Sequence, residues 1–185
     1  DPSLEAAAWD DVDIEPTGPM TEGDEVRVLR VVDAAANRAR EGLRVVEDFV
    51  RFVLDDRHLT GLLKQLRHDL TAATAAVAMD HRLAARETQC DVGTELTTDA
   101  ERERRGVGDV LAANFTRLQE ALRSLEEFGK LLDPDMAAVV EQLRYRTYTL
   151  HRASAIARAS RRRLAHARLY VLLDGQTTLE DFDLL

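Results

Sequence analysis

The sequence predicts an all-α protein in which two similar helical hairpins form a four-helix bundle. Two observations support this fold class: apolar residues recur at helical spacing, and one Arg/Glu-rich segment occurs twice. The first copy is NRAREGLRVVEDFVRF at 37–52, and the second is RLQEALRSLEEFGK at 117–130. A low aromatic content of 5% and abundant Ala also favour helices over sheets. We therefore expect an internal duplication with a pseudo-twofold axis.

The two copies preserve the order of their residues. Six positions of the first copy recur 79 positions later in the chain: Arg38, Glu41, Leu43, Arg44, Glu47 and Phe49. Asn37 and the triplet QLR at 65–67 recur 77 positions later instead, as Asn114 and the triplet at 142–144. The alignment near the helix starts is therefore ambiguous, and Arg117 corresponds either to Arg38 or to Arg40.

The first hairpin begins with a long amphipathic helix over 25–54. Its apolar residues follow a helical period: Val28, Val32, Ala35, Ala39, Leu43, Val46, Val50 and Val53. Asp56 is a suitable N-cap for a second helix that runs to about residue 85. Residues 86–98 then read as a loop, because Asp91 and Gly93 favour turns.

The second hairpin follows the same plan. A third helix is predicted from about residue 99 to 132, with a possible break near Gly106 and Gly108. Asp133 followed by Pro134 is a strong start signal, because Pro is favoured in the first turn after an N-cap. The fourth helix is predicted to run from there to about residue 166.

The two ends of the chain differ from this helical domain, which we place at 25–167. Residues 1–24 carry eight acidic residues and no Lys or Arg, and they lack helical periodicity, so we expect a disordered leader. Residues 168–185 begin with RLYVLLDG, a short apolar run with β-forming residues. We expect this run to be the first strand of a further domain that the chain does not continue.

Composition excludes several classes of function. The formal charge is -9, but residues 25–185 contain 26 acidic and 25 basic residues and are almost neutral. Such a body is poorly suited to non-specific nucleic-acid binding, and the acidic leader is poorly suited to anionic membranes. The single cysteine, Cys90, permits no internal disulfide and fits a cytoplasmic location. No apolar run reaches the length of a membrane span.

The repeated segment is the strongest candidate for a functional site. A helical period places Asn37, Arg40, Arg44 and Glu47 on one face of the first helix. Two such faces meeting in a bundle would form a polar centre, where Arg binds phosphate and paired acids hold Mg²⁺. The same pattern also fits solvated ion pairs or a buried structural network of charges.

Five blocks of the sequence resemble a known family: NRAREGLRVVED, LKQLRH, RETQCDVGTE, NFTRLQEALRSLEEFGKLLDP and EQLRYRTYTL. They are similar to the helical domain that precedes thiamine-phosphate synthase in some bacteria, and the resemblance covers about 26–150. It implies an ATP-dependent kinase that converts 4-amino-5-hydroxymethyl-2-methylpyrimidine phosphate to the diphosphate in thiamine biosynthesis. The tail RRLAHARLYVLLDG looks like the entry into the (β/α)-barrel of the fused synthase.

Candidate site residues come from the matched blocks. We expect three residues to act in catalysis: Arg44, Arg123 and Asp91. Substrate ligands are expected at Asn37, Arg40, Lys64, Arg67, Arg86, Asn114, Arg117 and Arg144. Ligands for Mg²⁺, the cofactor expected with ATP, are Glu41, Glu47, Glu120 and Glu126. Arg suits phosphate groups because its planar fork donates several hydrogen bonds, and carboxylates suit magnesium.

Two alternatives remain. The chain lacks a G-x-x-x-x-G-K-[ST] loop, which favours a non-catalytic scaffold or dimerisation module of the synthase. The paired acids also suggest an all-α nucleotide pyrophosphohydrolase, although the E-x-x-E spacing common in such sites is absent, since Glu120 is followed by Arg123. We expect small-molecule partners and neither nucleic acid nor membrane, and a homodimer is one assembly to consider.

Overall fold

The computed structural model describes residues 18–87, 89 and 103–168, and every regular element within them is an α-helix. These helices are α1 (Glu22–Phe52), α2 (Arg57–Thr74), α3 (Met79–Ala85), α5 (Val107–Gly129) and α6 (Pro134–Leu164). The all-α fold predicted from the repeated amphipathic pattern is therefore confirmed. None of these helices has an apolar stretch long enough to cross a membrane.

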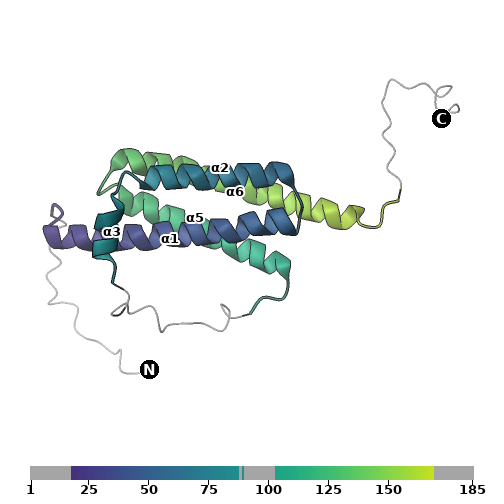
Figure 1. The fold of residues 1–185 in the computed structure, drawn as a ribbon, viewed down its shortest axis with the longest axis horizontal. Helices are drawn as coiled ribbons and strands as arrows, with labels where there is room; N and C mark the ends of the chain where they lie inside the picture. The colour runs from purple at the N-terminus through teal and green to yellow at the C-terminus, as the bar shows by residue number, and fades with distance from the viewer. Residues whose placement is uncertain (1–17, 88, 90–102, 169–185) are drawn as a thin grey trace, which may run out of the picture.

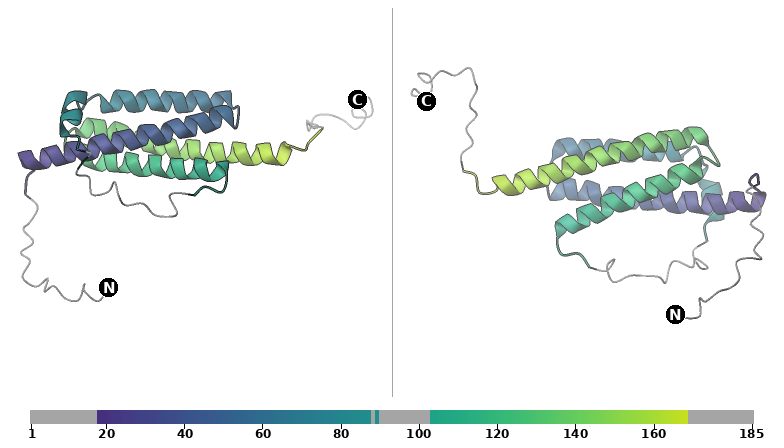
Figure 2. Two further views of the ribbon diagram at one scale, coloured as in Figure 1. Left: turned by 60° about the horizontal axis from the view of Figure 1, so that its bottom comes forward. Right: turned by 180° about the vertical axis from the view of Figure 1, so that it is seen from behind.

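The four long helices form a bundle of two antiparallel hairpins, α1–α2 and α5–α6 (Figure 1). Each helix packs against two neighbours: α1 against α2 and α5, and α6 against α5 and α2. Figure 2 shows that α1 and α5 run in opposite directions, while α2 and α5 run in the same direction. Helices α2 and α5 therefore begin at the same end of the bundle, and α3, which follows α2, packs on α1.

Side-chain caps fix where the helices begin. Asp56 accepts a hydrogen bond from the backbone N–H of Leu59, and Asp133 accepts one from Met136, both at 2.9 Å. Both predicted N-caps are thus confirmed, and Pro134 stands in the first turn of α6. Helix α1 begins at Glu22, three residues before the predicted start, because Thr21 and Asp24 form a capping box.

The core is aliphatic and drawn from all four long helices. Seven of the eight residues in the predicted apolar stripe of α1 are buried: Val28, Val32, Ala35, Ala39, Leu43, Val46 and Val50. The eighth, Val53, follows the end of α1 and is 41% exposed. Helical periodicity therefore identified the buried face of α1, and its one error lies where the helix stops.

The predicted second helix is divided in two, which corrects the prediction of one helix to residue 85. Helix α2 ends at Thr74, and α3 begins at Met79 after a turn. No Gly or Pro marks this break. Tertiary packing causes it instead, because Val77 turns into the core and Arg82 is buried as α3 folds back on α1.

Four features expected from the sequence lie wholly or mainly outside the described residues. They are the disordered leader at 1–24 (described from residue 18), most of the β-like tail at 168–185, Cys90 and Asp91. The described part of the predicted leader includes the first turn of α1. The loop expected at 86–98 is described only at 86, 87 and 89, and α5 begins immediately after Gly106, near the predicted break.

Helices α1 and α5 cross closely at Gly42. A Cβ atom added to Gly42 would lie 3.1 Å from the backbone oxygen of Asn114 and 3.5 Å from the Cβ atom of Leu118. The neighbouring positions of the crossing are also small, with Ala35 and Ala39 on α1. Backbones approach this closely only where side chains do not separate them, so the small residues set the spacing of the two hairpins.

A buried ion pair joins the two helices of each hairpin. Arg67 Nε on α2 donates to Glu47 Oε2 on α1 at 2.9 Å, and Arg144 Nε on α6 donates to Glu126 Oε2 on α5 at 2.7 Å. Both glutamates are buried. The Glu126 carboxylate also raises the pKa of Arg144. These pairs repeat because the first helices are related by 79 positions and the second helices by 77.

Replacement of Gly42 should test the close crossing. Gly42→Leu would force α1 and α5 apart, and we expect a loss of about 1–3 kcal/mol in the free energy of unfolding, typical of overpacking. Gly61→Leu is the matched control, because no atom lies within 4 Å of a Cβ atom there. It should be neutral or slightly stabilising. Urea unfolding measures both, and equal stability of the two variants would contradict the crossing.

Removal of one charge should test the buried ion pair of the second hairpin. Glu126→Gln leaves the Arg144 guanidinium buried without its carboxylate, so we expect a loss of about 3–5 kcal/mol. Glu127→Gln is the neighbouring control, and its exposed side chain should contribute little. The double variant Glu126→Leu with Arg144→Met should recover much of the loss, since no charge is then left alone. An unchanged urea midpoint for Glu126→Gln would contradict a structural role for this pair.

Candidate functional site

A groove of about 570 Å³ lies between α1 and α5 at their crossing. Each helix contributes five residues to its lining, and the ten are Ala35, Arg38, Glu41, Gly42, Val45, Asn114, Arg117, Glu120, Ala121 and Ser124. Every α1 residue in this lining has its partner on α5 79 positions later. The groove therefore lies on the pseudo-twofold axis, and Arg117 corresponds to Arg38 and not to Arg40.

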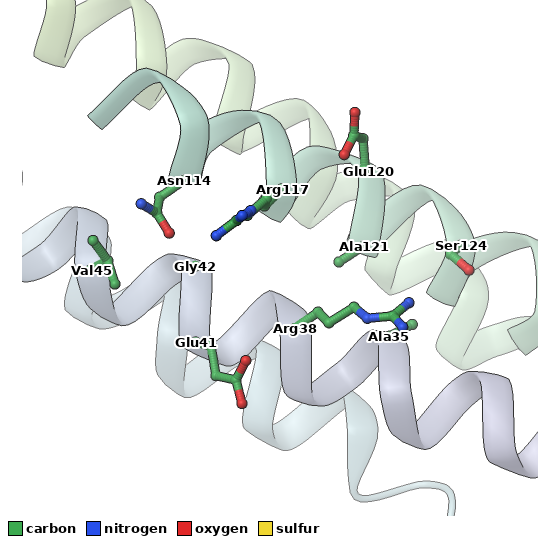
Figure 3. Close-up of a pocket in the computed structure, with 10 residues that line it drawn as sticks. All are labelled: Ala35, Arg38, Glu41, Gly42, Val45, Asn114, Arg117, Glu120, Ala121 and Ser124. Carbon is green, nitrogen blue, oxygen red and sulfur yellow. The ribbon is translucent and has the colours of Figure 1, made fainter. Parts of the chain in front are cut away.

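Two arginines occupy the centre of this groove (Figure 3). Arg38 reaches along the groove toward Ala121 and Ser124, while Arg117 reaches the opposite way, toward Gly42 and Asn114. Neither guanidinium makes a hydrogen bond or an ion pair with another described residue. Two unpaired cations above a floor of small residues form a surface suited to a ligand with several anionic oxygens.

The carboxylates of the groove have a different placement. Glu41 and Glu120 stand at opposite edges and point away from each other in Figure 3. No group of three or more metal-ligating side chains gathers anywhere in the described residues. Glu41 and Glu120 thus do not fit one magnesium ion held by both side chains.

The predicted catalytic arginines lie outside the groove. Arg44 approaches Glu47 at 3.8 Å, and Arg123 donates to Glu126 at 2.8 Å, so each rests against the exposed side of a buried ion pair. Both are more than half exposed. The predicted ligand face was centred on Asn37 and Arg44, whereas the groove face of α1 lies about a third of a turn away around the helix axis.

The structure divides the remaining predicted site residues. Asn114, Arg117, Glu41 and Glu120 line the groove. Glu47, Arg67, Glu126 and Arg144 form the ion pairs that hold the hairpins together. Lys64 is exposed on α2, and Asp91 lies outside the described residues. The residues expected in a single site are thus divided between a groove and a network of structural ion pairs. Glu41 and Glu120 belong to the groove, whereas Glu47 and Glu126 belong to the network.

Three further predicted ligands gather on a different face of α1, beside α3. Arg86 binds Asp33 through two hydrogen bonds of 2.7 and 3.0 Å. Asn37 donates to the same carboxylate at 3.3 Å, and Arg40 donates to Thr74 at 2.7 Å. Asn37 and Asn114 therefore do not share a site, although both were expected to bind substrate.

A second cleft of about 530 Å³ opens beside these residues. Its charged and polar lining consists of Arg27, Arg30, Asp33, Asn37, Arg38, Arg86 and Glu87. Arg38 lines both clefts, so the two are neighbours along α1. Asp33 and Arg82 were not predicted as site residues. Neither residue has an equivalent in the second hairpin, so the duplication did not point to them.

The known proteins that match this chain do so by sequence similarity. The ThiD2 family matches residues 30–153, which include most of the four long helices. A protein of Rhodopirellula baltica named thiamine-phosphate synthase is 43% identical over 83% of this chain and 42% of its own length. Proteins of the same name from Synechocystis sp. and Gloeobacter violaceus are each 44% identical, over 86% and 80% of this chain. No solved structure matches the chain.

These matches cover only part of each relative. The chain spans less than half the length of each of these curated relatives, with 45% of the Synechocystis protein and 42% of the Gloeobacter protein covered. The matched part nevertheless contains the groove, both buried ion pairs and the second cleft apart from Arg27. On the extent of the family match and the identity to these relatives, the chain belongs to the ThiD2 family.

Proposed function

We propose that this chain is the helical module of a thiamine-phosphate synthase and acts in thiamine biosynthesis. The support is the similarity to relatives that carry this name and extend well beyond the matched region. In this proposal the synthase barrel is a further part of the longer protein. Because the names of the relatives refer only to the synthase, they favour a supporting module over a separate enzyme.

One observation favours chemistry within the module itself. Arg38 and Arg117 lie on either side of the pseudo-twofold axis and extend in opposite directions along the groove, without ion-pair partners among the described residues, while the other repeated arginines, Arg44 and Arg123, are paired. Both side chains are exposed to water, so their donors are open to a ligand. A substrate with two or more phosphate groups would supply the missing partners.

The second proposed function is therefore phosphoryl transfer from ATP to hydroxymethylpyrimidine phosphate. An oxygen of the pyrimidine's phosphate attacks the γ-phosphorus, and the bond to the bridging oxygen breaks, so that ADP leaves. Such reactions depend on positioning and on charge stabilisation. Arg38 and Arg117 would hold the two phosphate chains in line, and Asn114 would orient one of them. Magnesium would enter with ATP as part of the co-substrate.

Incubation of the chain with Mg²⁺, ATP and the pyrimidine monophosphate distinguishes the two proposals. In the kinase proposal the diphosphate and ADP accumulate together, as ³¹P NMR would show. A non-catalytic module yields neither product and gives no heat with ATP in calorimetry. Nucleoside monophosphate with pyrophosphate would instead indicate the pyrophosphohydrolase alternative.

Replacement of the groove arginines should locate the chemistry. Arg38→Gln and Arg117→Gln should each lower kcat by about 10²–10³-fold, because each removes a charge-assisted contact to a transferring phosphate. Their melting temperatures should change little, since both side chains are exposed and unpaired. Arg152→Gln, an exposed arginine on α6, is the matched control and should retain full turnover.

Variants of the two arginines predicted to be catalytic, Arg44 and Arg123, test the alternative location of the chemistry. If Arg44→Gln and Arg123→Gln abolish turnover while the groove variants remain active, the chemistry lies on the outer face of α1 and α5. Loss of turnover only in the groove variants would place it at the pseudo-twofold axis.

A further inference from the structure

The guanidinium of Arg82 on α3 lacks the acceptors that a buried charge requires. Arg82 is only 2% exposed, and its Nε and Nη1 atoms have no hydrogen-bond partner among the described residues. Its Nη2 atom contacts the sulfur of Met79 at 3.7 Å, which is a weak acceptor. Burial of a charged group without hydrogen bonds costs several kcal/mol. The local packing therefore does not explain why the charged side chain of Arg82 is buried.

Two more arginines surround the same point. Arg86 binds Asp33 through two N–H groups, on Nε and Nη2, and Arg40 reaches Thr74, a neutral partner. Burial of Arg82 is the main cause that lowers its pKa, followed by repulsion from Arg40, and Asp33 opposes both. We call Arg40, Arg82, Arg86 and Asp33 the Arg82 cluster. Three positive charges and one negative charge leave it with an excess of two.

We propose that the Arg82 cluster is a binding site for the dianionic phosphate group of a small molecule. A phosphate provides three or four oxygens and two negative charges, which match the free donors and the excess charge of the cluster. A hydrogen bond to Thr74 holds Arg40 in place before the ligand arrives. The Arg82 side chain is fixed by its burial, so little conformational entropy is lost on binding.

The second cleft gives such a ligand a path to the cluster. Asp33 and Arg86 line this cleft, and Arg27, Arg30 and Arg38 on its walls make the entrance electropositive. The Arg86 side chain is 40% exposed, so it is free to move from Asp33 onto an incoming phosphate. Arg40 and Arg82 line neither this cleft nor the groove at the pseudo-twofold axis, so a ligand in the cleft reaches them only as Arg86 moves. The site thus stands independently of the phosphoryl transfer proposed above.

Thermal unfolding in inorganic phosphate tests this site at constant ionic strength, with chloride as the reference salt. The melting temperature of the unmodified chain should rise with phosphate concentration. Arg82→Met should melt at a higher temperature than the unmodified chain when phosphate is absent, because a buried unpaired charge is gone. The same variant should lose the response to phosphate, with binding at least tenfold weaker.

Control variants make each outcome decisive. Arg152→Met, exposed on α6, should respond to phosphate as the unmodified chain does. If Arg82→Met does not fold, Arg86→Gln at the surface should still weaken phosphate binding at least tenfold. A chain that responds equally to phosphate and chloride, or an Arg82→Met variant that melts lower and keeps its response, would overturn the site. Methyl phosphate in a parallel titration distinguishes a phosphomonoester from free phosphate by their relative affinities.

Discussion

The close crossing of α1 and α5 is the constraint on which the rest of the structure depends. Gly42 lets the backbone of one hairpin approach the Asn114 carbonyl of the other, and this contact lies beside the pseudo-twofold axis. The crossing brings the two copies of the Arg/Glu segment together. It also determines that the residues one turn apart on each helix, Arg38 and Glu41 with Arg117 and Glu120, line one groove. A wider spacing would separate the copies into two unrelated surfaces.

The duplicated charges serve two purposes, and burial distinguishes them. Glu47 and Glu126 point into the hairpins, where each needs an arginine from the second helix to offset the loss of water. Arg38 and Arg117 point into an open groove, where water solvates them and a ligand can replace that water. The same sequence repeat therefore encodes a structural contact and a candidate binding surface on adjacent faces of one helix.

The fold could be predicted from the sequence to a large extent, because helical periodicity and N-caps are local signals. Asp56, Asp133 and Pro134 marked two helix starts correctly, and the apolar stripe of α1 marked its buried face. The break after Thr74 could not be predicted, since it follows from the packing of Val77 and carries no local signal. The site was predicted less well for a similar reason. Which face of α1 packs against α5 depends on tertiary structure. Arg38 and Arg40 are only two residues apart but lie on different faces of α1, and local sequence does not show which of these faces meets α5.

An ion pair on the opposite side of the bundle shows what a covalent duplication makes possible. Asp69 on α2 accepts a hydrogen bond from Arg146 on α6 at 2.6 Å, and these two residues occupy equivalent positions, 77 apart. In a symmetric dimer of one hairpin, the same position would place like charges together, either two aspartates or two arginines. Each half of this chain is therefore complementary to the other half and repelled by its own copy. An exposed pair adds little stability, but it disfavours the packing of two identical hairpins from different molecules.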